Sequence, residues 1–160
     1  MTLFLGIGSN IEAERNIRQA AVLIKKYFPT IRFSSVYTSK ATDLTDQADF
    51  LNAVAMIETE QLPEQIQKIL NDIEQTLGKN ISVRFGPRTI DLDILLCDDC
   101  VYVTKELTIP HPRMHERRFV LEPLLELIDP DGLHPVLGRS WKELRRQSID
   151  QRCEKTAMGL

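Results

Sequence analysis

The segment from Thr89 to Leu96 constrains the fold most, because apolar and acidic residues alternate along it. Successive side chains of an extended strand point to opposite faces, so this period of two predicts a strand with one apolar and one polar face. Asp91 and Asp93 fall on the polar face, roughly 6.5 Å apart. Two neighbouring carboxylates repel each other and need a cation or an arginine as a partner. The apolar face is expected in a core and comprises Ile90, Leu92, Ile94 and Leu96.

The residues before this strand make the acidic pair a candidate site for magnesium and phosphate. Mg²⁺ prefers carboxylate oxygens and keeps waters and substrate phosphates as its other ligands. Arg88 follows Gly86 and Pro87, a permissive residue and then a rigid one, so we expect its guanidinium to be held in a defined direction. The alternative is a surface strand whose aspartates are solvated or paired with an arginine.

The string GPRTIDLDIL at residues 86–95 resembles the signature of the 6-hydroxymethyl-7,8-dihydropterin pyrophosphokinases of folate biosynthesis. Further similarity to that family lies in GIGSN at 6–10, DFLNA at 49–53, PHPRMHER at 110–117 and FVLEPL at 119–124. The resemblance implies an enzyme that transfers the terminal two phosphates of ATP, as a unit, to the hydroxymethyl group of the pterin. The implied products are AMP and the pterin diphosphate, and the implied cofactor is a pair of Mg²⁺ ions.

Matched position by position, the resemblance implies a set of site residues. The metal ligands would be Asp91 and Asp93, and the catalytic residues would be Arg88, Asp91, Asp93 and His111. The residues expected at ATP are Glu74, Lys79, Arg84, Arg88, Ile94, Thr108, His111 and Arg117. Those expected at the pterin are Leu44, Phe50, Asn52 and Phe119.

Two stretches depart from the family pattern. The segment from Ser39 to Thr45 stands where the family has a proline-rich loop, and Lys79 stands where arginine is common. Lysine keeps the charge but lacks the bidentate fork of arginine. We therefore expect these departures to affect the rate, loop closure and pterin choice rather than the class of reaction.

Hydrophobic periodicity predicts the remaining elements. Strands at 2–7, 31–37, 50–58 and 89–96 are interspersed with helices at 13–28 and 63–77. This order of strand, helix, strand, strand, helix, strand predicts an α+β fold, a ferredoxin-like antiparallel sheet of the split βαβ type with helices on one face. Extra C-terminal helices are expected at 119–128 and after Ser140, followed by a loosely held tail from about residue 149.

Three long loops are expected to gather at the other face of this sheet, at 39–49, 79–87 and 104–113. The first two are polar, and we expect them to close only when both substrates are bound.

Length and charge limit the other possibilities. At 160 residues the chain is expected to form a single domain over 1–160. A net charge of −3 with interspersed signs argues against a nucleic-acid or membrane surface. An odd number of cysteines, three, without an apolar signal segment indicates a reducing compartment, so we expect a cytoplasmic protein. A monomer is expected as well.

Several motifs have two interpretations. Gly6 and Gly8 suggest a nucleotide-binding turn, but the glycine spacing does not fit, so a structural turn is favoured. Cys97 and Cys100 fit a hairpin at Asp98 and Asp99 better than a zinc site, which needs a second pair of ligands. Asn52, in the middle of a strand, is expected either to bind a neighbouring loop or to recognise the edge of a ligand.

The whole chain also has an alternative interpretation, a ferredoxin-like pterin- or nucleotide-binding regulatory module without catalysis. Such a module would explain the sheet, but it would not require Asp91, Asp93, Arg88 and His111 together.

Overall fold

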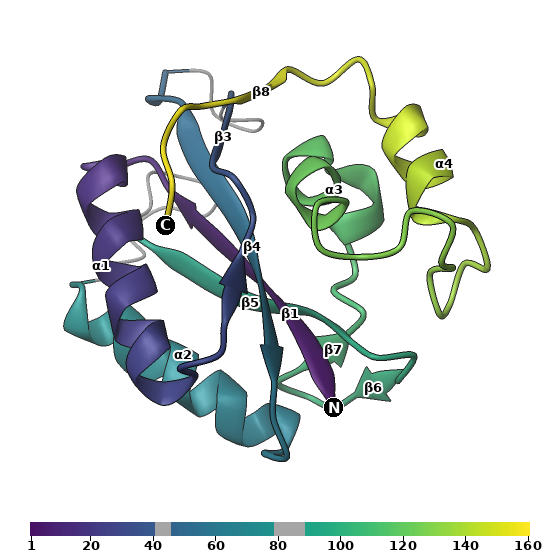
Figure 1. The fold of residues 1–160 in the computed structure, drawn as a ribbon, viewed down its shortest axis with the longest axis horizontal. Helices are drawn as coiled ribbons and strands as arrows, with labels where there is room; N and C mark the ends of the chain where they lie inside the picture. Colours follow the sequence, from purple (N-terminus) through teal and green to yellow (C-terminus); the bar gives the residue numbers. More distant parts are fainter. Residues whose placement is uncertain (41–45, 79–88) are drawn as a thin grey trace.

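A computed structural model describes residues 1–40, 46–78 and 89–160, and it contains an antiparallel sheet covered on both faces (Figure 1). The strands lie in the order β5 (Asp91–Cys97), β1 (Thr2–Ser9), β4 (Phe50–Glu58), β3 (Tyr37–Ser39) and β8 (Cys153–Lys155). The short strand β2 (Arg32–Phe33) also pairs with β4. The predicted ferredoxin-like order is confirmed, because β1 and β4 occupy the centre of the sheet.

Helices α1 (Ala13–Tyr27) and α2 (Pro63–Thr76) cover one face of the sheet, as predicted (Figure 1). Their apolar stripes pack on the side chains of β1, β4 and β5 that point the same way, including Leu5, Ile57 and Leu92. Pro63 begins α2, and Gly78 follows its end with a positive φ of 77°.

The opposite face is covered in part by helix α3 (Arg118–Leu124), with α4 (Trp141–Gln147) packed behind it (Figure 1). Phe4 and Val54 from the sheet form a second core with Leu121 and Trp141. The 3₁₀ helix η1 (Met114–Glu116) precedes α3 directly. Ser140 caps α4 by accepting a hydrogen bond from the Glu143 N–H, which confirms the predicted start of that helix.

Strand β5 does not keep its alternation to the end. Its pairing with β1 shifts by one residue between Phe4 and Leu5, and this irregularity leaves Leu95 without a partner in the register. The prediction that Leu96 shares the face of Ile94 is therefore wrong: Leu96 packs in the second core, because an extra residue turns every later side chain to the other face.

The structure corrects two turn predictions near the strands. Gly6 and Gly8 lie within β1, not in a turn, and the strand continues to Ser9, whose hydroxyl donates to the Thr89 carbonyl. The turn after Cys97 forms, but the strand that follows it, β6 (Tyr102–Val103), pairs with β7 (Thr108–Ile109) and not with β5.

The predicted strand at 31–37 is divided into β2 and β3 at a pair of serines. The Ser34 hydroxyl accepts a hydrogen bond from the Val54 N–H at 2.9 Å, and Ser35 donates both its N–H and its hydroxyl to the Glu126 carboxylate. The side chains thus satisfy groups that a continuous ladder would have paired.

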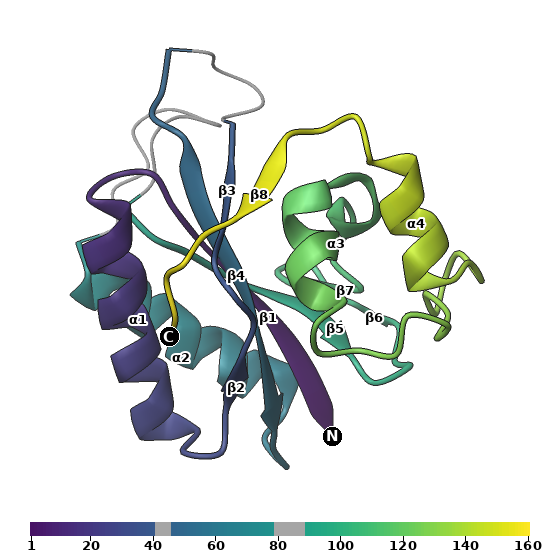
Figure 2. The ribbon, with the colours of Figure 1, turned by 45° about the horizontal axis from the view of Figure 1, so that its top comes forward.

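The C-terminal tail is ordered, contrary to the expectation of a loosely held segment. Strand β8 adds to the edge of the sheet beside β3, and Met158 and Leu160 pack against the first core near α1 (Figure 2). Main-chain pairing and apolar contacts therefore hold a segment whose composition suggested neither. Within the described residues, none of the helices is long and apolar enough to span a bilayer.

Candidate functional site

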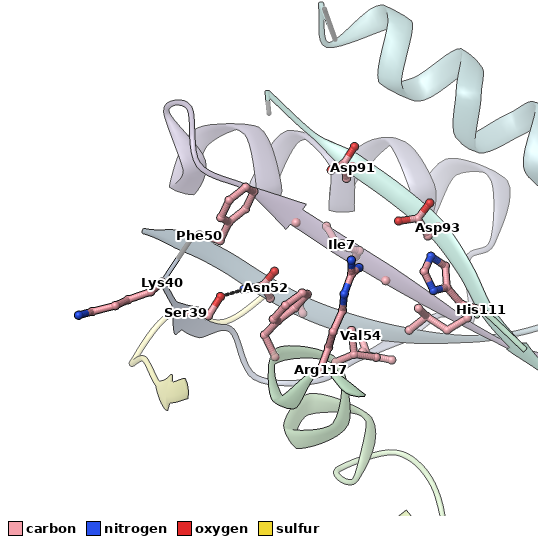
Figure 3. Close-up of a pocket in the computed structure, with 16 residues that line it drawn as sticks. Ile7, Ser39, Lys40, Phe50, Asn52, Val54, Asp91, Asp93, His111 and Arg117 are labelled. Atoms are coloured by element: carbon pink, nitrogen blue, oxygen red, sulfur yellow. Dashed lines mark hydrogen bonds between the residues drawn. The ribbon is translucent and has the colours of Figure 1, made fainter. Parts of the chain in front are cut away.

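A cavity of about 160 Å³ lies on the sheet face that α3 partly covers (Figure 3). Strands β1, β4 and β5 form its floor, while His111, Arg117 and α3 contribute one wall. The lining residues are Gly6, Ile7, Gly8, Ser39, Lys40, Phe50, Asn52, Ala53, Val54, Asp91, Asp93, Leu95, His111, Arg117, Phe119 and Val120.

The acidic pair stands on β5 beside two glycines of β1. Asp91 is opposite Gly8 in the register and Asp93 is opposite Gly6, so no side chain of β1 stands next to either carboxylate. Asp93 is exposed and Asp91 is half-buried. The carboxylates are therefore accessible from the cavity, which is the condition for binding a hard cation together with ligand phosphates.

His111 sits next to Asp93 at the same end of the cavity (Figure 3). Its main-chain N–H donates to the Leu95 carbonyl at 2.8 Å, and its Nδ1 accepts from the Arg113 N–H at 3.2 Å. Burial lowers the pKa of His111, and Arg117 and Arg113 lower it further, while Asp93 acts in the opposite direction. The ring is therefore neutral at pH 7, with its hydrogen on Nε2, the nitrogen available to a ligand.

The other end of the cavity carries aromatic and amide groups. Phe50 and Asn52 point into it from β4, and Phe119 does so from α3. Asn52 is buried, and its Nδ2 donates to the Ser39 hydroxyl at 2.8 Å. Both sequence interpretations of Asn52 are thus compatible with its position, since the residue binds a neighbouring segment and also lines the cavity.

A guanidinium lies between the two ends. The Arg117 guanidinium carbon is 5.5 Å from the centre of the Phe119 ring. Arg117 has extended backbone angles (φ −115°, ψ 109°) at the junction of η1 and α3. The junction thus places the positively charged side chain of Arg117 in the cavity, beside His111 and the acidic pair.

Three of the residues implied by the resemblance lie elsewhere. Glu74 is buried on α2 and accepts a hydrogen bond from the Leu92 N–H at 2.7 Å. Ile94 belongs to the core beneath α1 and α2, and Thr108 lies in β7, paired with Val103. Four further residues fall outside the described part of the chain: Leu44, Lys79, Arg84 and Arg88.

Sequence reasoning missed several lining residues. Val54 shares a strand face with Phe50 and Asn52, so the period of two could have identified it. Leu95 shares the strand face of Asp91 and Asp93, so the same period could have identified it as well. Ser39 and Lys40 fall in the first predicted loop, where no pattern distinguishes one polar residue from another, although the structure places Ser39 at the end of β3.

The two cysteines of the C-x-x-C motif are chemically unlike. Cys97 is buried, which together with neighbouring Cys100 and Asp98 raises its pKa to about 11, whereas Cys100 is exposed. Within residues 1–40, 46–78 and 89–160, no group of three or more His, Cys, Asp or Glu side chains is placed to hold a metal ion. A structural zinc of four ligands has no support in this part of the chain.

Comparison with known proteins gives concordant matches. Residues 4–129 match the family described as 7,8-dihydro-6-hydroxymethylpterin-pyrophosphokinase. A 2-amino-4-hydroxy-6-hydroxymethyldihydropteridine pyrophosphokinase of Aquifex aeolicus is 36% identical over 148 residues, which cover 92% of each chain. A protein of the same name from Bacillus subtilis is 41% identical over 127 residues, covering 78% of this chain and 76% of that relative.

The structural comparison agrees at the level of the fold. A crystal structure of Plasmodium falciparum HPPK-DHPS with pteroate superposes with a TM-score of 0.70 at 16% identity. The match covers 92% of this chain and 42% of that one, so this chain spans less than half of the larger protein. At so low an identity the likeness shows the fold alone.

Proposed function

The chain belongs to the 7,8-dihydro-6-hydroxymethylpterin-pyrophosphokinase family, and on that premise we propose that the cavity between the sheet and α3 is its active site. The reaction is transfer of pyrophosphate from ATP to the hydroxymethyl group of 6-hydroxymethyl-7,8-dihydropterin, a step of folate biosynthesis. The observation that carries the assignment is the convergence on one cavity of two carboxylates, a histidine and an arginine with two phenylalanines and an asparagine.

The donor set fits magnesium. Asp91 and Asp93 supply hard oxygen ligands, and the glycines opposite them leave room for water and phosphate oxygens. We propose that these two carboxylates hold the Mg²⁺ ions that accompany ATP. When bound, the metal neutralises phosphate charge and polarises the phosphoryl group that is transferred.

At the phosphate end, the side chains are proposed to position the phosphates of ATP and to neutralise their charge. Arg117 is assigned to phosphate oxygens, and the neutral His111 donates a hydrogen bond from Nε2. Because Arg113 fixes Nδ1 as an acceptor, the His111 ring cannot rotate without losing that contact. Arg88, Arg84 and Lys79 are proposed as further phosphate ligands from the segment outside the described residues.

At the pterin end, the residues hold a flat heterocycle. Phe50 and Phe119 are proposed to stack on its two faces, and Asn52 to hydrogen-bond its edge. Ser39 uses one of the two N–H donors of the Asn52 amide, so the amide oxygen and the second N–H are proposed to pair with the pterin edge. The proposed contacts with the two substrates are completed by Leu44, Glu74, Ile94 and Thr108.

The protein is also proposed to be cytoplasmic and monomeric.

The test is incubation of the purified protein with ATP, Mg²⁺ and 6-hydroxymethyl-7,8-dihydropterin, with nucleotide products resolved by chromatography. AMP and the pterin diphosphate in equal amounts are expected. Release of ADP would instead indicate transfer of a single phosphate, and binding without any product would favour the regulatory module. Phe119→Ala should raise the KM for the pterin more than the KM for ATP, by about tenfold or more, if the stacking assignment is correct.

A further inference from the structure

The C-terminal tail contacts the junction that presents Arg117 to the cavity. The side-chain amide of Gln151 donates from Nε2 to the Glu116 carbonyl at 2.7 Å. Its Oε1 accepts from the Arg118 N–H at 2.9 Å. One side chain therefore pairs with the main chain on both sides of Arg117.

The geometry of this contact matches an extended residue. In an extended backbone, the carbonyl before a residue and the N–H after it point to the same side. Arg117 is extended, so a planar amide can pair with both groups at once, as a neighbouring strand would. The main chain of Arg117 is thereby held along one edge.

The contact also satisfies a helix terminus. The Arg118 N–H is the first of α3, and the first N–H groups of a helix have no partner within it. Gln151 supplies that partner from 33 residues away. Phe119, the next residue of α3, lines the cavity, so the contact holds the main chain directly before a lining residue.

The tail is held in return by Arg118. Its Nη1 donates to the carbonyls of Ile149 and Gln151, both at 2.9 Å, and its Nε contacts Glu122 at 3.0 Å. Arg118 and Gln151 thus form a reciprocal pair in which each side chain binds the main chain of the other. Gln151 lies beyond residue 129, where the family match ends.

We propose that Gln151 is a positioning residue for pyrophosphate transfer, which acts by fixing the main chain around Arg117 and thereby aligning Arg117 and Phe119 with the two substrates. This inference rests on the proposed function of the cavity. Small misplacements of groups that orient reacting atoms lower rates by up to about a hundredfold. Loss of the contact should therefore impair catalysis in molecules that remain folded.

The experiment compares Gln151→Leu and Gln151→Glu with two controls. Gln147→Leu makes the same change at an exposed glutamine of α4 that contacts Arg139. Ser148→Ala removes a hydrogen bond at the end of α4, where the tail begins, from the Ser148 hydroxyl to the Arg145 carbonyl, without touching residues 116–118. Fluorescence of Trp141, the only tryptophan of the chain, reports the folded fraction of each variant.

In Gln151→Leu we expect kcat to fall by about tenfold or more and the KM for both substrates to rise severalfold. A smaller folded fraction would lower the apparent kcat but leave KM unchanged. Gln151→Glu keeps the acceptor for the Arg118 N–H and loses the donor to the Glu116 carbonyl. Its kcat and KM values should therefore lie between those of Gln151→Leu and those of the wild type. Amide exchange at Arg118, followed by NMR, should be fast in Gln151→Leu and slow in Gln151→Glu.

Two results would overturn the inference alone. The first is an unchanged KM in Gln151→Leu although Arg118 exchanges fast. The second is an equal kinetic defect in Ser148→Ala, which would mean that any loss of tail stability has the same effect. Wild-type protein that releases no AMP would refute the proposed function and this inference together, so the two failures are distinguishable.

Discussion

The Glu74 carboxylate accepts a hydrogen bond from the main-chain N–H of Leu92 at 2.7 Å, which fastens α2 to β5 at the residue between Asp91 and Asp93. Glu74 is buried, and Leu92 is part of the core. An acidic residue that resemblance places at the nucleotide thus also has a structural role on the opposite side of the strand.

Replacing Glu74 tests that role. Glu74→Leu leaves the Leu92 N–H without its acceptor in the core, so we expect the free energy of unfolding to fall by about 1–3 kcal/mol. Glu74→Gln retains an acceptor for the Leu92 N–H, so its free energy of unfolding should fall by less than that of Glu74→Leu. Urea denaturation measures both, with Gln75→Leu on the exposed side of the same helix as the control. Equal stability of all three variants would contradict a structural role and leave only a contact with ATP.

Removing either carboxylate of the acidic pair should stop the reaction. In Asp91→Asn or Asp93→Asn we expect turnover to fall at least about a hundredfold, because the proposed Mg²⁺ site loses a charged ligand. The fold should be unchanged or more stable, since two repelling charges are reduced to one. AMP release as a function of Mg²⁺ concentration measures the effect, and Asp99→Asn on the exposed turn is the control. Near-normal Mg²⁺-dependent turnover would rule out the proposed ligands.

Gly8 provides a way to disturb the pterin end without removing any polar group. A Cβ at this position would lie 3.2 Å from the Asn52 Oδ1, closer than most such contacts. Gly8→Ala should therefore displace the Asn52 amide and raise the KM for the pterin by about tenfold. Because Gly8 also stands opposite Asp91, a smaller rise in the KM for ATP is expected as well. Pterin kinetics measure this. An unchanged KM would argue that the Asn52 oxygen does not contact the substrate.

His134 should make stability depend on pH. Burial and the neighbouring His115 lower the pKa of His134 below its usual value of 6.5. Its Nδ1 accepts from the N–H groups of Val136 and Leu137, an arrangement that requires the neutral ring. Below pH 6.5 the unfolded chain binds more protons than the folded one, so stability falls as the pH falls through this range.

His134→Asn places an amide oxygen near the position of Nδ1 but removes the titrating group. Between pH 7 and pH 5 we expect the variant to lose less stability than the wild type. His111 also lowers stability as the pH falls, but it does so equally in both proteins. Above pH 7 the variant should be less stable by about 1 kcal/mol, because the ring contact with Trp141 is lost. Thermal unfolding across this pH range measures both effects. Parallel pH profiles would show that His134 does not titrate differently on folding.

Local pattern sufficed wherever one element decides the position of a side chain. The alternation in Phe50–Glu58 predicted both faces of β4, and Pro63 and Gly78 predicted the ends of α2. Propensity, capping and period act within a few residues, so they can be read directly from the sequence. The same reasoning placed Asp91 and Asp93 on one face of β5 before any tertiary contact was known.

Tertiary structure decided what depends on pairing between distant segments. The irregularity that turns Leu96 into the second core arises from the register of β5 on β1, which the sequence of β5 does not contain. The tail from residue 149 lacks a strong pattern, yet it pairs with β3, because main-chain hydrogen bonds do not depend on residue type. It also meets residues 116–118 through the side chain of Gln151, whose partners are distant in the sequence. The amino-acid sequence thus determined the strands and helices that carry the proposed site residues, and the packing of segments far apart in the chain decided where those residues meet.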